Sequence, residues 1–134
     1  IKATLVDGSF HPVDSSGICF EIAGGHAFSK GLKEAKPVLL EPVMKVAITV
    51  NDEDTGEIMC DLNGKRGKIL GMNPEGNGTT IIEAEVPQSE MLKYATDLRS
   101  ITQGRGSYTL EFDHYEAVPT HMLDRVVKVK ETEE

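Results

Sequence analysis

The sequence predicts an α+β fold in which a small antiparallel sheet carries two helices. Three observations predict it: segments with apolar residues at every second position, segments with apolar residues three and four apart, and a strand–helix pattern that occurs twice. The chain has 134 residues, of which 39% are hydrophobic and 27% are charged, and this balance is typical of a globular protein.

The composition excludes several classes of function. There are 14 Lys and Arg residues against 22 Asp and Glu, and this net charge of -8 argues against a non-specific nucleic-acid coat, which needs clustered cations. No apolar run approaches the roughly 20 residues of a membrane span, so no membrane partner is expected. Two cysteines, Cys19 and Cys60, are too few for a disulfide framework, which indicates a reducing compartment and a cytoplasmic location.

The first part of the chain, residues 1–41, carries a βα(β) pattern. Residues 1–6 are predicted to form a strand that enters a turn at 7–9, where Asp-Gly favours a turn because glycine accepts positive φ. A helix is expected over 16–35, with serines at its start and a proline beyond its end. These elements are too few to close a core. Since the chain begins inside an expected strand, we expect a fragment of a longer protein, with a piece of a second α/β domain at its start.

Six elements are expected in the second part of the chain, residues 42–117. They are strand 43–50, helix 52–65, strand 68–72, strand 82–86, helix 89–101 and strand 108–112. The turn dipeptides Asn-Pro and Asn-Gly separate the two middle strands. A short helix is expected after Pro119, followed by a frayed tail, so residues 118–134 form a separate C-terminal segment.

The apolar residues on one face of each element form the expected core. They are Met44, Val46, Ile48, Val50, Ile58, Leu62, Ile82, Ala84, Val86, Met91, Ala95, Leu98, Tyr108, Leu110 and Phe112. The last three alternate along one strand and are expected to point inward together. An RNA-recognition domain that stacks bases on such aromatic rings is therefore disfavoured.

A repeat within residues 42–117 identifies the arrangement of these elements. Asp-Leu pairs at 61–62 and 97–98 occupy corresponding places, and each is followed by an Arg-Gly pair, at 66–67 and 105–106. A duplicated βαβ unit is what the ferredoxin-like split βαβ fold requires: the order βαββαβ, with four antiparallel strands and two helices on one face.

No pattern typical of catalysis or metal binding is present. The phosphate-binding motif G-x-x-x-x-G-K-[ST] fails because Met59 stands where its first glycine should be. The histidines and cysteines lack metal-ligand spacing, and no zinc-protease or nucleophile-elbow motif occurs. We therefore expect no catalytic residue, no metal and no cofactor in this chain. A ferredoxin-like regulatory domain that binds a small molecule is one competing class of function.

The loop at 7–14 is the first candidate binding surface. Its candidate residues are Gly8, Ser9, Phe10, His11 and Asp14. The loop joins a strand to a helix, and the simplest interpretation is a plain connection. Its length and its glycine and proline constraints favour a second interpretation, a rigid protrusion that touches a partner.

The second candidate surface follows the expected helix 89–101 and is rich in hydrogen-bond donors. Its candidate residues are Arg99, Ser100, Gln103 and Arg105. They compensate a helix dipole, or they form a fork of donors for phosphate or base edges. Lys65 and Arg66 end the other helix in the same way and are candidates for the same surface, although a solvated helix end is the simpler interpretation.

Three stretches of the chain form longer motifs. They are D-G-S-F-H-x-V-D-S-S at 7–16 (with Pro at x), P-V-L-L-E-P-V-M-K-V at 37–46 and Y-A-T-D-L-R-S-I-T-Q-G-R-G-S-Y at 94–108. With these motifs the chain resembles the C-terminal part of bacterial elongation factor G from Ile1 to about Pro119. The resemblance implies that residues 1–41 are the second half of that factor's fourth domain and residues 42–117 its fifth, ferredoxin-like domain.

The resemblance implies a role in protein synthesis for the first loop. In this family the fourth domain reaches the decoding centre and keeps the tRNA–mRNA pair in register during translocation. His11, with Gly8, Ser9 and the turn to Asp14, matches the tip loop of that domain.

For the second loop the resemblance implies contact with large-subunit ribosomal RNA. Arg99, Ser100 and Gln103 match the positions of the family's fifth domain that meet the sarcin–ricin loop. The ribosome would thus be the partner of both loops. GTP and magnesium would belong to a GTPase domain that is absent here, and this piece would act mechanically.

Two departures from the family pattern keep alternatives open. Pro12 stands where an acidic residue usually follows the histidine, and Gly17 replaces an acidic residue in the first turn of the helix. A paralogue of elongation factor G and a ribosomal protection factor of the tetracycline-resistance type both remain alternatives; the histidine in the tip favours the former. Self-association through an exposed strand at 1–6 is a further expectation.

Overall fold

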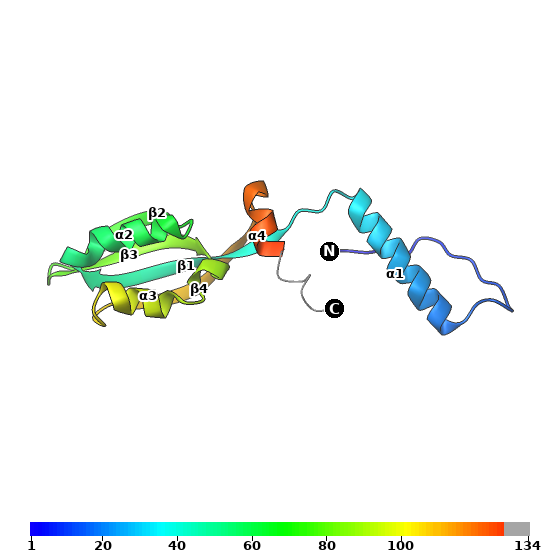
Figure 1. Cartoon of the computed structure of the whole chain (residues 1–134), viewed down its shortest axis with the longest axis horizontal. Helices are drawn as coiled ribbons and strands as arrows, with labels where there is room; N and C mark the ends of the chain where they lie inside the picture. Colours follow the sequence, from blue (N-terminus) through cyan, green and yellow to red (C-terminus); the bar gives the residue numbers. More distant parts are fainter. Residues whose placement is uncertain (128–134) are drawn as a thin grey trace. The chain divides into compact units, whose positions relative to one another are not determined.

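The computed structural model describes residues 1–127, and the chain divides into two compact units, with the boundary in the sequence between Val38 and Leu39. The first unit holds one long helix, and the second holds a four-stranded sheet with its helices (Figure 1). No helix within residues 1–127 combines the length and the apolar character that crossing a membrane requires.

The first unit is a loop followed by helix α1, Gly17–Glu34. Ser16 precedes the helix in an extended conformation, and the amide of Ala35 closes the last turn on the carbonyl of Gly31 at 2.9 Å. The expected strand at 1–6 is wrong, because these residues adopt no regular structure. A strand needs a hydrogen-bonded neighbour, and residues 1–38 contain no second strand for it to pair with.

The second unit contains an antiparallel sheet of four strands in the order β2-β3-β1-β4. The strands are β1 Leu40–Asn51, β2 Lys68–Pro74, β3 Thr79–Pro87 and β4 Ser107–Ala117. Two helices join them, α2 Thr55–Gly64 between β1 and β2 and α3 Tyr94–Ile101 between β3 and β4. The order βαββαβ confirms the predicted α+β, ferredoxin-like fold.

Both outer strands of this sheet depart from regular pairing at one place. Val43 of β1 pairs with His114 of β4, and the next residue of β1, Met44, pairs with Phe112. Asp113 of β4 is therefore left without a partner position. In β2, the register shifts between Ile69 and Gly71. Such irregularities bend an edge strand and interrupt its ladder of hydrogen bonds.

Short 3₁₀ turns complete the second unit. They are Asp52–Asp54 before α2, Gln88–Met91 before α3 and Thr120–Met122 before the short helix α4, Leu123–Val127. The single helix expected at 89–101 is therefore wrong. It divides at Lys93, whose φ of -114° is not helical, because a tight 3₁₀ turn starts the segment. The expected tail beyond residue 127 lies outside the described residues.

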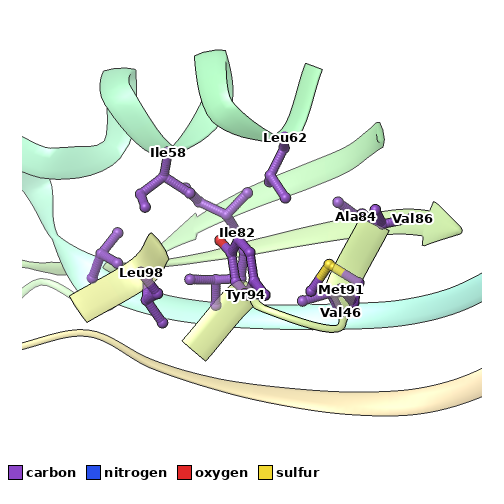
Figure 2. Packing of buried hydrophobic residues seen from close by; sticks show 11 residues of the cluster. Val46, Ile58, Leu62, Ile82, Ala84, Val86, Met91, Tyr94 and Leu98 are labelled. Carbon is purple, nitrogen blue, oxygen red and sulfur yellow. The ribbon is translucent and has the colours of Figure 1, made fainter. Parts of the chain in front are cut away.

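The core of the second unit lies between the helices and one face of the sheet (Figure 2). Its fully packed members are Val46, Ile48, Val50, Ile58, Leu62, Ile82, Ala84, Val86, Met91, Tyr94 and Leu98. Tyr94 was not expected there; it lies at the centre, and its ring meets that of Tyr108 edge-on at 5.2 Å between centroids. Ala95 and Met44 are only half-buried.

The expectation that all of β4 contributes to the core is wrong at two residues. Tyr108 packs against the core, but Leu110 is 39% exposed and Phe112 is 51% exposed. The alternation predicted their face correctly, since Leu110 pairs with the buried Val46. β4 is an outer strand, however, and the cluster of packed helix and strand residues ends before these two side chains.

Candidate functional site

The donor-rich loop at the end of α3 is exposed, as a binding surface requires. Arg99 and Ser100 lie on the last turn of α3, and Gln103 and Arg105 follow in the loop to β4; all four side chains are exposed. The structure thus brings together the four candidates of this loop within one turn and one short connection. Their hydrogen-bonding groups are directed to solvent, apart from those of Arg105.

The backbone of this loop is held in a specific shape. Gln103 and Gly104 both have positive φ, 54° and 83°, which turns the chain sharply after the helix. The amide of Gly104 donates to the carbonyl of Arg99 at 2.9 Å, and the amide of Arg105 donates to that of Thr102 at 3.1 Å. These bonds satisfy carbonyls at the helix end that would otherwise need water.

Thr102 anchors the loop from inside. Its side chain is fully buried, and its hydroxyl donates to the carbonyl of Leu98 at 2.7 Å and accepts from the amide of Gly106 at 2.9 Å. A Cβ on Gly106, the residue before β4, would lie 3.0 Å from the side chain of Thr102, so a larger residue there would have to displace Thr102 slightly. The exposed donors are therefore displayed on a rigid base.

Arg105 makes the one ion pair of this loop that the described residues contain. Its Nη2 lies 3.3 Å from Oε1 of Glu53, and the two side chains are 49% and 68% exposed. A pair this open to solvent contributes about 0–1 kcal/mol. The pair with Glu53 therefore holds Arg105 only weakly.

Lys65 is engaged within the protein. Its Nζ lies 2.7 Å from Oδ1 of Asp61 and 3.0 Å from Oδ2 of Asp97, which joins α2 to α3. Burial acts to lower the pKa of Lys65, but the hydrogen bonds to Asp61 and Asp97 outweigh it, and the pKa is raised.

Arg66 forms ion pairs with two carboxylates, those of Glu41 and Glu90. Its guanidinium makes a bidentate pair with Glu41, at 2.8 and 3.0 Å, and its Nε lies 3.4 Å from Glu90. The pKa of Arg66 is raised, first by the bond to Glu41. Arg66 has a φ of 58°, so the residue also makes the left-handed turn after α2. Lys65 and Arg66 thus differ from the exposed donors at the end of α3, because both are paired with carboxylates within the protein.

The loop at 7–14 is exposed throughout. Its two ends are fixed locally: Oδ1 of Asp7 accepts from the amide of Gly8 at 2.7 Å, and the Oγ of Ser15 accepts from the amide of His11 at 2.8 Å. The ring of Phe10 stacks on that of Phe20 from α1, with centroids 6.2 Å apart. Gly8, Ser9, His11 and Asp14 are left facing solvent, so this loop can present an imidazole to a partner.

A hollow of about 650 Å³ lies between α2 and α3 and is lined by Asp61, Lys65, Glu90, Lys93 and Asp97 among others. This is where a small-molecule ligand of the competing class would fit best. Lys65 is paired with Asp61 and Asp97, and Glu90 is paired with Arg66 from outside the hollow. Lys93 makes no ion pair within residues 1–127, so it is the charged group that such a ligand would meet first.

Sequence reasoning missed two residues that shape these surfaces. Glu41 is 9% exposed and is tied to Arg66 from 25 positions away, a partnership that no local pattern indicates. Thr102 is hidden in the motif R-S-I-T-Q-G-R-G, where its position after the helix and before Gly-x-Gly is the available signal.

The second unit has the α+β, ferredoxin-like fold, and it follows a separate unit formed by residues 1–38. Two family models match the chain in succession: "Elongation factor G, domain IV" over residues 1–36 and "Elongation factor G C-terminus" over residues 38–126. The chain belongs to the elongation factor G family. Neither of the matched domains is the family's GTPase domain.

A solved structure is similar to most of this chain. A crystal structure of a protein from Thermus thermophilus matches it with 45% sequence identity and a TM-score of 0.71. The match covers 91% of this chain but only 18% of the Thermus chain. The present chain therefore spans less than a fifth of the length of that relative.

Proposed function

We propose that this chain is the ribosome-binding part of a translational GTPase that promotes tRNA–mRNA translocation. It would contact large-subunit ribosomal RNA through the loop after α3 and the decoding centre through the loop at 7–14. The observation that carries the proposal is the rigid display of Arg99, Ser100 and Gln103 at the end of α3, in a chain of the elongation factor G family.

The chemistry of the loop after α3 supports an RNA partner. Arg99 offers a planar fork of donors that matches phosphate oxygens or a base edge, and Ser100 and Gln103 add neutral donors beside it. The anchored backbone limits the entropy lost on binding, since the loop does not have to become ordered. We leave Lys65 and Arg66 out of this surface, because both already hold carboxylates.

The second unit is acidic, and this limits where RNA can bind to it. Residues 42–117 hold 7 Lys and Arg and 13 Asp and Glu, so most of the unit repels a phosphate backbone. An RNA contact is therefore confined to a local spot, and losing one arginine there should matter more than losing one elsewhere.

The test for this surface is Arg99→Ala in the full-length factor. The ribosome concentration that half-saturates GTP turnover should rise about 10-fold, as expected for a lost charge-assisted hydrogen bond. Arg125→Ala, which removes the same charge from α4, is the control and should leave the value unchanged. Equal values for Arg99→Ala and the parent factor would contradict the proposed contact.

The test for the loop at 7–14 is His11→Ala. We expect slower movement of tRNA and mRNA in single-turnover translocation, with ribosome-stimulated GTP hydrolysis nearly unchanged, because the change removes a group that contacts tRNA and leaves the docking surface intact. His26→Ala on α1, another exposed histidine, is the control. Loss of hydrolysis with normal translocation would refute this assignment.

A further inference from the structure

A histidine and two carboxylates come together on the sheet of the second unit. Glu85 from β3 and Asp113 and His114 from β4 each offer one ligand atom, and these atoms all lie within 4.8 Å of one another. β1 runs between β3 and β4, so the cluster bridges three strands. The sequence spacing does not predict a metal site here, because Glu85 lies far along the chain from Asp113 and His114.

The register explains how the three groups meet. Lys45 of β1 pairs with Glu85 on one side and Glu111 on the other, while the next residue, Val46, faces the buried core. Glu85 therefore points to the face of the sheet opposite the core. The irregularity in β4 inserts Asp113 before His114, and this extra residue brings both side chains toward Glu85.

Both ring nitrogens of His114 contact carboxylates. Its Nδ1 lies against Oδ2 of Asp113, and its Nε2 lies 2.8 Å from Oε1 of Glu116. A histidine that binds a metal through one ring nitrogen almost always donates its other N–H to a carboxylate or carbonyl, which fixes the tautomer. Glu116 occupies that position. In the structure Nδ1 contacts Asp113, so a metal shared with Asp113 and Glu85 would take the place of the proton between these two groups.

The local charge favours a cation. Carboxylates of Glu85, Asp113 and Glu116 lie close to the ring of His114. Lys45 and Lys68 both pair in register with Glu85, but within residues 1–127 neither makes an ion pair shorter than 4.0 Å. Among the described residues, His114 is thus the close partner of Asp113 and Glu116, and one imidazole faces three carboxylates.

We propose that Glu85, Asp113 and His114 bind a divalent metal ion of the zinc class, with Glu116 positioning the imidazole. Zn²⁺ accepts imidazole nitrogen and carboxylate oxygen together, and three protein ligands leave its fourth position to water. Mg²⁺ prefers an all-oxygen octahedron and suits this set poorly. The ion would connect β3 to β4 across β1 and stabilise the sheet.

The experiment is a calorimetric titration of the full chain, first stripped of metal with a chelator, with Zn²⁺ and separately with Mg²⁺. We expect one equivalent of Zn²⁺ to bind at micromolar concentration and Mg²⁺ to bind at least 10-fold more weakly. Zn²⁺ should also raise the melting temperature, because it binds the folded chain.

Variants locate the site. His114→Gln should weaken Zn²⁺ binding at least 10-fold, Glu116→Gln should weaken it about 10-fold, and both should abolish most of the thermal shift. Lys45→Met should strengthen binding a few-fold, because it removes a competing positive charge beside Glu85. His26→Gln, on α1, is the matched control and should bind as the parent does.

Three results would overturn the proposal. They are no heat of binding at 100-fold excess of Zn²⁺, equal affinity in the parent and His114→Gln, or Mg²⁺ binding as tight as Zn²⁺. The melting temperature of each metal-free variant shows that it is folded, so a lost signal reports the site itself.

Discussion

Arg66 both forms the turn after α2 and pairs with carboxylates from other parts of the second unit. It adopts a left-handed φ of 58° after α2 and directs its guanidinium to Glu41 and Glu90. The side chains of Arg66 and Glu41 are 21% and 11% exposed, so removing one partner leaves the other charge poorly hydrated.

Replacing Arg66 by Met tests the strength of this tie. Met keeps the same backbone strain and much of the volume, so the difference reports the lost pairing. We expect the free energy of unfolding in urea to fall by about 2–4 kcal/mol. Arg105→Met, which breaks the open pair with Glu53, should change it by less than about 0.5 kcal/mol. Similar losses for the two variants would contradict this account.

The sequence predicted the exposure of Arg99 and Gln103 better than the ion pairing of Lys65 and Arg66. Arg99 and Gln103 are distinguished by their place in a specific motif, and the structure leaves both exposed. Lys65 and Arg66 form the same kind of basic helix end, and their carboxylate partners come from other elements. Local patterns report where a charge lies along the chain, whereas tertiary packing decides which charge it meets.

At the scale of elements, the connection from α2 to β2 depends on a close approach of backbones. The amide of Gly67 donates to the carbonyl of Leu62 at 2.8 Å, and a Cβ on Gly67 would lie 2.7 Å from that same oxygen. Gly64, three positions earlier, would meet nothing within 4 Å. Two neighbouring glycines therefore have opposite roles.

The two glycines form a matched pair for mutation. Gly67→Ala should destabilise the protein by about 1–3 kcal/mol, because the helix end must shift to admit the methyl group. Gly64→Ala should stabilise it by about 0.5–1 kcal/mol, since alanine favours the helix. Thermal unfolding of both variants measures the signs, and a shared sign would show that the approach at Gly67 is not limiting.

Strand periodicity predicted the central strands well and the outer strand only in part. β1 and β3 lie between neighbours, so their alternation becomes alternate burial. In β4 the same alternation places Leu110 and Phe112 on the correct face but does not bury them. The strand expected at 1–6 failed for a related reason, since a pattern of residues cannot supply the neighbour that a strand needs.

For the whole molecule, the two units differ in how they are stabilised. The second unit has a continuous core, whereas α1 in the first unit has no buried residue and leaves Ile18, Phe20, Ile22 and Phe28 about half exposed or more. A helix of 18 residues without tertiary packing is only marginally stable in water. In the elongation factor G family this segment is part of a domain IV, and the match here covers residues 1–36.

Hydrogen exchange should therefore separate the two units. We expect the amides of α1 to exchange orders of magnitude faster than those of β1 and β3, which should open only with global unfolding. Exchange followed by NMR or mass spectrometry on the full chain measures this directly. Equal protection of α1 and β1 would mean that a surface packs on the apolar side of the helix in solution.

The interrupted registers of β2 and β4 also bear on how this sheet behaves at high concentration. A straight outer strand invites an extra strand from another molecule, but here each rim of the sheet is broken where Leu70 or Asp113 has no partner position. Growth of the sheet into stacked ribbons is therefore obstructed on both sides, and the domain can expose apolar groups such as Phe112 beside one rim without offering a template for aggregation.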